Sequence, residues 1–152
     1  MHKLYDFIEA RERLTTVVVK TKLIHSPVFS EESGNEIYLK PENLQKTGSF
    51  KIRGAYNKIA KLTEEEKKKG VIASSAGNHA QGVAYAAKRL GINVVIVMPK
   101  HTPLIKVEAT RKYGAEVVLY GEVYDDAYKK ALELQKENGY VFVHPFNDED
   151  VI

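Results

Sequence analysis

The sequence predicts an α/β protein in which four parallel strands form a sheet between two layers of helices. Three observations lead to this prediction. Short apolar segments alternate with longer segments of helical periodicity along residues 49–152. The short segments are apolar throughout, as expected for parallel strands that are covered on both faces. The 152 residues are also enough for one domain with a buried core.

The expected strands are short, and turn-forming residues end most of them. They are Val71–Ala73, Asn93–Met98, Glu116–Tyr120 and Tyr140–Val143. A proline or a glycine follows within two residues of the last three, which is typical of the end of a strand. These four segments therefore predict the four strands of the sheet.

The helices expected between the strands have recognisable end signals. They are Phe50–Leu62, a short exposed helix that begins at Thr63, Asn78–Leu90, Pro103–Tyr113 and Val123–Asn138. A glycine directly follows each of the last three, as is common where a helix ends. Thr63, with a glutamate three residues later, predicts a capping box at the start of the exposed helix.

Residues 1–48 do not share this alternation, and we divide the chain into residues 1–48 and 49–152 for that reason. Within the first part, Asp6–Val19 has the spacing of a helix. Thr21–Gly34 is rich in serine and predicts a loop with short extended pieces. Glu36–Lys40 predicts a strand.

The composition excludes several classes of protein. Hydrophobic residues make up 43% and charged residues 28%, which is ordinary for a soluble globular chain and excludes a disordered or collagen-like one. The absence of cysteine excludes disulfides, cysteine-ligated zinc, iron–sulfur clusters and thiol chemistry. The longest apolar stretch, Val94–Met98, is far short of the roughly 20 residues that span a bilayer. Because Met1–Tyr5 contains no apolar signal region, we expect a cytoplasmic protein without a membrane partner.

Charge and histidine spacing argue against nucleic-acid and metal sites. The net charge is only +3, and basic and acidic residues are interleaved, as in Glu64–Lys69. Such a run is typical of a solvated helix face and not of a nucleic-acid patch, which is one-sided. His79, His101 and His144 have no zinc-ligand spacing. We therefore expect no nucleic-acid partner and no bound metal.

One candidate binding loop follows the first predicted strand. In parallel sheets, ligands bind beyond the carboxyl ends of the strands. The loop Ser74–Gly82 runs directly into a helix, and its small residues allow main-chain N–H groups to approach a ligand. With the partial positive charge of the helix N-terminus, these groups suit a carboxylate or a phosphate. The alternative, equally compatible with the local pattern, is that Ser75 or Asn78 only caps the helix.

Lys51 is the candidate nucleophile. It lies near the start of a predicted helix, between the apolar residues Phe50 and Ile52. Apolar surroundings and a helix N-terminus disfavour the charged form of an amine, which makes it a better nucleophile. The alternative is an ordinary surface charge, as expected for most of the 23 basic residues.

Three stretches of the chain resemble the fold-type II family of pyridoxal-phosphate enzymes, and most closely its threonine/serine dehydratase (threonine ammonia-lyase) branch. They are LKPENLQKTGSFKIRGA, ASSAGNHAQGVA and HPFND. The resemblance extends from Leu14 to Ile152. It implies that residues 49–152 are the small domain of such an enzyme, that residues 1–48 belong to its large domain, and that the cofactor is pyridoxal 5'-phosphate.

The resemblance also implies a role for each residue of the two candidate segments. Lys51 bonds to the cofactor aldehyde, Phe50 packs against the pyridine ring, and Asn78 hydrogen-bonds the ring hydroxyl. The substrate carboxylate is held, largely by main-chain N–H groups, by Ser75, Ala76, Gly77, Asn78 and His79. The freed Lys51 removes the α-proton of L-threonine or L-serine, the β-hydroxyl leaves, and the products are a 2-oxo acid and ammonia.

Ala76 favours elimination over racemisation. Eukaryotic serine racemases resemble this chain, but they have a second serine at this position, which acts as an acid/base on the opposite face of the cofactor. Ala76 has no proton to exchange, so the resemblance favours a dehydratase. The neighbouring Ser75 leaves serine racemase as an alternative.

Members of the family are more than twice as long as this chain. Their additional part supplies a glycine-rich loop for the cofactor phosphate, whereas no two of the ten glycines here are adjacent. We therefore expect the 152 residues to be a fragment, a truncation or one half of a split enzyme, with exposed apolar surface and little or no activity alone. The alternative is a non-catalytic folding module or a half-enzyme that needs a complementary chain. For the full-length family member, the resemblance implies a homo-oligomer.

Overall fold

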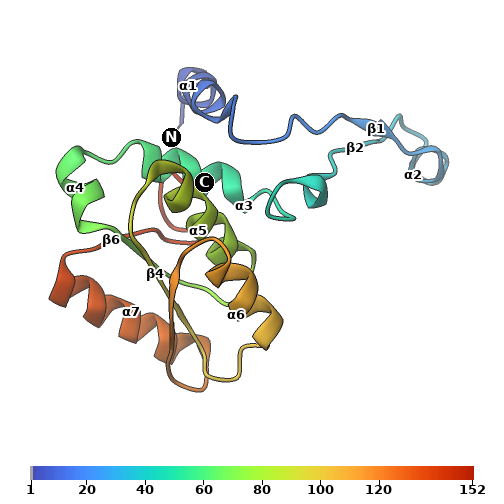
Figure 1. Ribbon diagram of the computed structural model, residues 1–152. Coiled ribbons are helices and arrows are strands. Elements are labelled where there is room, and N and C mark those ends of the chain that lie inside the picture. Colours follow the sequence, from blue (N-terminus) through green and yellow to red (C-terminus); the bar gives the residue numbers. More distant parts are fainter. Residues whose placement is uncertain (1) are drawn as a thin grey trace.

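The computed structural model describes residues 2–152, and its centre is a four-stranded sheet (Figure 1). The strands are β3 (Val71–Ser74), β4 (Val94–Met98), β5 (Glu116–Leu119) and β6 (Val141–Phe142). Their order in the sheet is β5-β4-β3-β6, and every pair is parallel. The predicted parallel sheet is therefore confirmed, with each strand within two residues of its expected ends.

Helices cover both faces of the sheet. One face is covered by α3 (Lys51–Ala60), α5 (Asn78–Leu90) and α6 (Leu104–Arg111), and the other by α7 (Tyr124–Asn138). The three-layer α/β/α arrangement predicted from the sequence is thus confirmed. Among residues 2–152, no helix combines the length and the apolar composition needed to cross a membrane.

The alternation of side chains along the strands produces two separate apolar clusters. Ile96 of β4 packs in one cluster with Val83 of α5, whereas Val95 and Val97 pack in the other with Ala131 of α7. All residues of β3 and β4 are buried as a consequence. Burial on both faces explains why every position of these strands except Ser74, the last residue of β3, is apolar.

A glycine allows α5 to approach the first turn of α3 closely. A Cβ atom on Gly82 would lie 3.0 Å from the carbonyl carbon of Lys51 and 3.1 Å from the amide nitrogen of Ile52. Only a residue without a side chain permits this backbone contact without displacement. The contact fixes the start of α3 relative to the start of α5.

The capping signals in the sequence locate the helix ends well. The bounds of α5 are those predicted, and Gly91 follows it in the left-handed conformation, with φ of 68°. The short helix α4 (Glu64–Lys69) begins after Thr63, whose hydroxyl accepts a hydrogen bond from the N–H of Glu66 at 3.2 Å. The carboxylate of Glu66 accepts the N–H of Thr63 at 2.8 Å, which completes the predicted capping box.

The predicted helix Asp6–Val19 is wrong at its C-terminal end, because α1 (Leu4–Leu14) stops earlier. The residues that follow are mostly β-branched, and such residues fit a helix poorly. Gln45 offers the backbone other partners: its side chain accepts the N–H of Val19 at 3.0 Å and donates to the carbonyl of Val19 at 2.6 Å.

The predicted loop over Thr21–Gly34 is also wrong in part, because it contains the helix α2 (Pro27–Ser33). Pro27 occupies the first helical position, where its missing N–H costs nothing, and Gly34 ends the helix at φ of 68°. The expected extended pieces are present: β1 (Ile24–His25) pairs antiparallel with β2 (Tyr38–Leu39), which lies inside the predicted strand.

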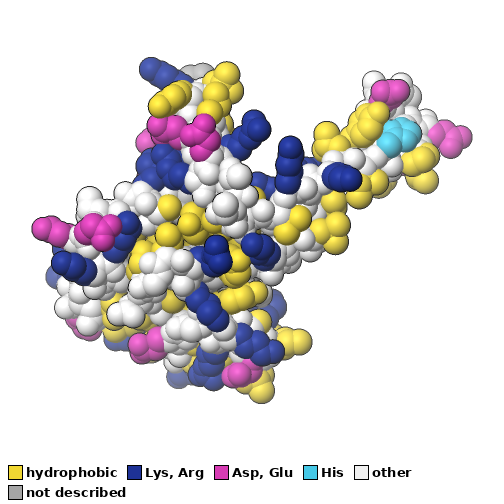
Figure 2. Space-filling model, turned by 45° about the horizontal axis from the view of Figure 1, so that its top comes forward, with side chains coloured by type: hydrophobic (Ala, Val, Ile, Leu, Met, Phe, Trp, Pro, Cys, Tyr) yellow, Lys and Arg dark blue, Asp and Glu magenta, His cyan; other side chains and the backbone are white. Residues whose placement is uncertain are grey.

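The elements β1, α2 and β2 form an arm that reaches away from the rest of the molecule (Figure 1). Hydrophobic side chains cover much of the arm in Figure 2. Those that are at least half exposed are Leu23, Ile24, Val28, Phe29 and Tyr38. Apolar surface is therefore exposed on this arm, which lies within residues 1–48.

An ion pair joins the first 48 residues to α3. Glu42, in the 3₁₀ helix η1 (Glu42–Leu44), accepts hydrogen bonds from Nε and Nη2 of Arg53 at 2.8 and 2.9 Å. The hydroxyl of Thr21 donates to the same carboxylate at 2.7 Å. The hydrogen bonds from Arg53 lower the pKa of Glu42 from 4.5 to about 2. This two-point contact lies two residues from Lys51 and fixes the outer face of α3.

The substitution Glu42→Gln tests the contribution of this pair to stability. Since the pKa of Glu42 is lowered by folding, its contribution is complete above pH 4.5 and is lost as the pH falls toward about 2. We expect Glu42→Gln to lower the free energy of unfolding by about 2 kcal/mol at pH 7 and to flatten its decline in that acidic range. Urea unfolding at a series of pH values measures both effects.

Glu64→Gln is the matched control. Glu64 pairs with Lys67 on the surface of α4, and its side chain is 82% exposed. Solvent-exposed pairs contribute little, so we expect this variant to unfold like the unaltered chain. If Glu42→Gln gives the same unfolding curves as Glu64→Gln at every pH, the stabilising role of the Glu42–Arg53 pair is refuted.

Candidate active site

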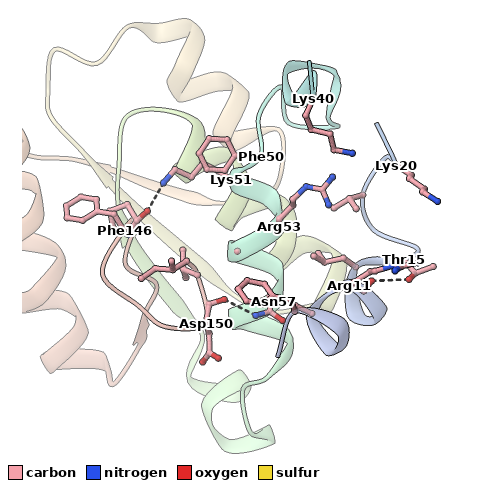
Figure 3. Close-up of a pocket in the computed structure, with 18 residues that line it drawn as sticks. Arg11, Thr15, Lys20, Lys40, Phe50, Lys51, Arg53, Asn57, Phe146 and Asp150 are labelled. Carbon is pink, nitrogen blue, oxygen red and sulfur yellow. Dashed lines mark hydrogen bonds between the residues drawn. The ribbon is translucent and has the colours of Figure 1, made fainter. Parts of the chain in front are cut away.

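The candidate residues gather at the carboxyl end of the sheet, where the general rule for parallel sheets places a ligand. Lys51 is the first residue of α3, and the loop Ser75–Gly77 joins β3 to α5. Pro145 follows β6, and its carbonyl oxygen accepts a hydrogen bond from Nζ of Lys51 at 2.6 Å (Figure 3). The close contact at Gly82 holds the backbone of Lys51 against α5.

Lys51 is half-buried, and its amine has one apolar and one polar neighbour. Nζ lies 5.4 Å from the centre of the Phe50 ring and donates to the carbonyl of Pro145. The Phe50 ring is 58% exposed, whereas Ile52 is fully buried. Phe50, and not the buried Ile52, is therefore the apolar neighbour that presents an accessible surface beside the Lys51 amine.

An open pocket of about 900 Å³ lies between α1, α3 and the segment after β6. Phe50, Lys51 and Phe146 line one side of it, and Arg11 and Thr15 line the other (Figure 3). The residues from Ser75 to His79 do not line this pocket. The structure thus places Phe50 and Lys51 in one cavity and the predicted carboxylate loop outside it.

The loop before α5 is shaped by its own serine. The hydroxyl oxygen of Ser75 accepts the N–H of Gly77 at 3.2 Å. Gly77 is the residue that precedes α5, and no side chain caps this helix. The alternative that Ser75 or Asn78 serves only as the helix cap is therefore wrong. Asn78 is exposed, so its amide group is free to contact a ligand.

Several main-chain N–H groups of this loop and of the first turn of α5 have no acceptor within residues 2–152. They belong to Ala76, Asn78, His79 and Ala80. The first N–H groups of a helix have no partner inside the helix, and the helix dipole adds partial positive charge there. The loop therefore offers hydrogen-bond donors that suit an anionic group such as a carboxylate.

The side chain of His79 points into the protein and not toward solvent. It is 3% exposed, and its Nε2 lies 2.9 Å from the carbonyl oxygen of Val143. Because a carbonyl only accepts, Nε2 holds the proton and donates. Burial lowers the pKa of His79 to about 4, and the charge of Lys51 acts in the same direction, so the ring is neutral at pH 7. Only the main chain of His79 is available to a ligand.

Nδ1 of His79 is buried and has no hydrogen-bond partner in the described part of the chain. The ring nevertheless has a structural effect, since it ties the start of α5 to the end of β6. The next residues along the chain from Val143 include Pro145, the acceptor of the Lys51 amine. The carboxylate loop and the lysine are thus joined through the segment after β6.

Pro145 and Asp148 had no predicted role, although both lie at the candidate site. Both belong to the HPFND stretch that contributed to the family resemblance. The only signal in the sequence was their position after a predicted strand, at the end of the sheet where ligands bind. A carbonyl oxygen that accepts a hydrogen bond has no sequence signature, which is why Pro145 was missed.

Comparison with known proteins identifies the family. Residues 14–152 match the family of pyridoxal-phosphate dependent enzymes. The chain belongs to this family. The resemblance found in the sequence is confirmed, and pyridoxal phosphate is the cofactor of the family.

Two curated relatives are similar over nearly the whole chain. The L-threonine ammonia-lyase of Thermotoga maritima is 60% identical over 152 residues, which are 100% of this chain and 38% of the relative. The catabolic L-threonine dehydratase of Escherichia coli strain K12 is 51% identical over 147 residues, which are 97% of this chain and 45% of the relative. The chain therefore spans less than half the length of these relatives.

Two solved structures have the same fold. Threonine deaminase isoform 2 from Solanum lycopersicum superposes with a TM-score of 0.87 at 41% identity, covering 99% of this chain and 43% of that one. The serine racemase of Dictyostelium discoideum superposes with a TM-score of 0.91 at 38% identity, covering 98% of this chain and 48% of that one. The likeness in fold therefore includes both a deaminase and a racemase.

The residues present fit the aldehyde and the aromatic ring of pyridoxal phosphate. An aldehyde needs an amine within reach of a pocket, and Lys51 provides one beside the open ring face of Phe50. The buried hydroxyl of Ser74 has no partner in the described residues, and the unpaired N–H groups of the neighbouring loop are donors for an anion. The amine and the ring face thus suit the aldehyde and the aromatic ring of the cofactor, whereas the N–H donors suit a separate anionic group such as the carboxylate of an amino acid.

The buried state of His79 predicts a second pH range in which stability changes. The unfolded chain binds a proton on this residue below pH 6.5, whereas the folded chain does so only near pH 4. Its contribution to stability is therefore complete above pH 6.5 and is lost as the pH falls to about 4. We expect a loss of about 2–3 kcal/mol over this range, which His79→Gln removes because the amide stays neutral.

Chemical unfolding between pH 4 and 7 measures this effect. His101→Gln is the control, since His101 is 79% exposed and we expect the slope to be unchanged. An equally steep loss of stability in the His79→Gln variant would contradict the assignment of this pH range to the buried imidazole.

Proposed function

We propose that this chain is the lysine-bearing part of a pyridoxal-phosphate dependent dehydratase that converts L-threonine or L-serine to a 2-oxo acid and ammonia. The observation that supports this most is the position of Lys51. Its amine lies at the wall of an open pocket, beside the ring of Phe50 and at the carboxyl end of the parallel sheet. The names of the two curated relatives both include L-threonine and support this choice of substrate.

Three residues would hold the cofactor. The amine of Lys51 would bond to the cofactor aldehyde, and the exposed face of Phe50 would pack against the pyridine ring. Asn78, exposed at the start of α5, would donate its amide N–H to the ring hydroxyl. When bound, pyridoxal phosphate delocalises the charge that remains on the substrate after a proton leaves Cα.

The loop before α5 would bind and orient the substrate. The unpaired N–H groups of Ala76, Asn78 and His79 would donate to the substrate carboxylate, with Ser75 and Gly77 shaping the loop. A carboxylate held in this way fixes which bond at Cα can break. Nζ of Lys51 would then remove the proton from Cα, and the hydroxyl would leave from Cβ as water. Hydrolysis returns one water, so the net products are the 2-oxo acid and ammonia.

Elimination is favoured over racemisation by the side chains of the loop. Racemisation needs a group that returns a proton to the face opposite Lys51, and the methyl group of Ala76 has none to give. The hydroxyl of Ser75 is turned toward its own loop, where it accepts the N–H of Gly77. Serine racemase is the second candidate function, because the fold is shared with such an enzyme and Ser75 is close by.

A chimeric enzyme tests the proposed reaction. In it, residues 1–152 replace the matching residues of the Thermotoga maritima relative, with which they are 60% identical. With pyridoxal phosphate and L-threonine, we expect release of a 2-oxo acid. We expect Lys51→Ala to reduce the rate by at least about 10³-fold, because the amine that moves the proton is lost. Lys129→Ala, an exposed lysine on α7, is the matched control and should keep full activity.

A folded chimera that releases no 2-oxo acid from L-threonine or from L-serine would refute the dehydratase proposal. Formation of D-serine faster than 2-oxo acid would favour the racemase instead. The chain alone, assayed in parallel, tests the expectation of little or no activity. Release that appears only in the chimera would support a half-enzyme that needs the remaining part of the family's chain.

A further inference from the structure

The segment after β6 crosses α3 along most of its length. At the start of α3, the carbonyl of Pro145 accepts the Lys51 amine at 2.6 Å. Near the end of α3, the amide of Asn57 donates to the carbonyl of Asp150 at 2.9 Å, as Figure 3 shows. We call residues 144–151 the crossing segment.

An ion cluster anchors the middle of the crossing segment to α3. Nζ of Lys58 lies 3.2 Å from a carboxylate oxygen of Asp148 and 3.4 Å from one of Asp150. The three side chains are 21%, 13% and 27% exposed, respectively, so Asp148 is the most buried of them. Charges largely removed from water attract each other more strongly than surface pairs do. Lys61 adds a second ion pair to Asp150.

The crossing segment also touches the backbone of α3 directly. A Cβ atom on Gly54 would overlap the carbonyl oxygen of Val151, so the two backbones have no side chain between them. Within the segment, Nδ1 of His144 accepts the N–H groups of Phe146 and Asn147 at 3.3 and 2.9 Å. These bonds form a turn around Pro145. The turn is therefore fixed by its own hydrogen bonds, and the ion pairs of Asp148 and Asp150 with Lys58 hold it against α3.

The turn matters because it holds the only hydrogen-bond acceptor of the Lys51 amine within residues 2–152. A lysine side chain has four flexible carbon atoms and no preferred direction of its own. When the neutral amine donates one N–H to the carbonyl of Pro145, its lone pair stays free for bond formation. A Pro145 carbonyl that is held in place therefore fixes the direction of the lone pair on Nζ of Lys51, whereas a mobile carbonyl does not.

We propose that Asp148, paired with Lys58, is a positioning residue for the Lys51 amine. Asp148 touches no reacting group. It acts by holding the turn whose Pro145 carbonyl orients Nζ of Lys51 toward the pocket. The proposal rests on the proposed function of Lys51 as the amine that bonds to the cofactor aldehyde.

The test measures how fast pyridoxal phosphate bonds to Lys51 in the purified chain. After mixing at several cofactor concentrations, borohydride traps the bond and mass spectrometry quantifies the label on Lys51. The dependence on concentration gives a maximal rate constant and a half-saturating concentration. We expect Asp148→Asn to lower the maximal rate constant by about 3- to 10-fold with the half-saturating concentration unchanged. Asp150 still pairs with Lys58 in this variant, so the fold is retained.

Two further variants separate positioning from general stability. Lys58→Arg keeps the cation beside Asp148, and we expect it to keep the rate of the unaltered chain. Lys130→Met removes a surface ion pair of similar length, with Glu133 at 3.0 Å on α7, and should leave both parameters unchanged.

The outcomes distinguish this inference from the proposed function. If the unaltered chain shows no saturable label on Lys51, the proposed function of Lys51 fails. If the unaltered chain is labelled there and Asp148→Asn is labelled equally fast, only the positioning role is overturned. If Asp148→Asn lowers the maximal rate constant, raises the half-saturating concentration and lowers the melting temperature together, Asp148 has a structural role, and this result also overturns the proposal.

Discussion

The close contact between α5 and the first turn of α3 is the constraint on which the rest of the site depends. The backbones approach so closely that a Cβ atom on Gly82 of α5 would lie only 3.0 Å from the carbonyl carbon of Lys51. The N-termini of two helices therefore lie at one end of the sheet, one bearing an amine and the other a row of unpaired N–H groups. The third component, the segment after β6, reaches both: Val143 accepts from His79, and Pro145 accepts from Lys51.

Much of the fold could be predicted from the sequence because the local signals agree with the tertiary structure. Strands β3 and β4 are apolar except at Ser74 because helices cover both faces, and Gly91 ends α5 where glycine is expected. The failures have tertiary or competing local causes. At the end of the predicted helix Asp6–Val19, the side chain of Gln45, which lies 26 residues from Val19, takes up the backbone hydrogen bonds of Val19. In α2, Pro27 and Gly34 were signals for a helix, but the serines between them favoured a loop.

The candidate site was predictable in its residue types but not in its geometry. Lys51 and the loop from Ser75 to His79 stand out through chemistry and family resemblance, and their roles stay predictions. The sequence does not show that the ring of His79 is buried against Val143, because a histidine in the first turn of a helix has the same local pattern whichever way its side chain points. Nor does it reveal Pro145 or Asp148, whose contacts with α3 join residues more than 80 positions apart. Such contacts arise only when β6 takes its place beside β3.

The most direct test of the central claim is to locate the cofactor on the chain. The purified chain is mixed with pyridoxal phosphate, the bond is trapped with borohydride, and the labelled residue is identified by mass spectrometry. We expect saturable labelling of Lys51 alone, together with a yellow colour, and we expect both to be absent in the Lys51→Ala variant. Labelling scattered over many of the lysines, with no preference for Lys51, would contradict the claim that this amine is placed to bind the cofactor.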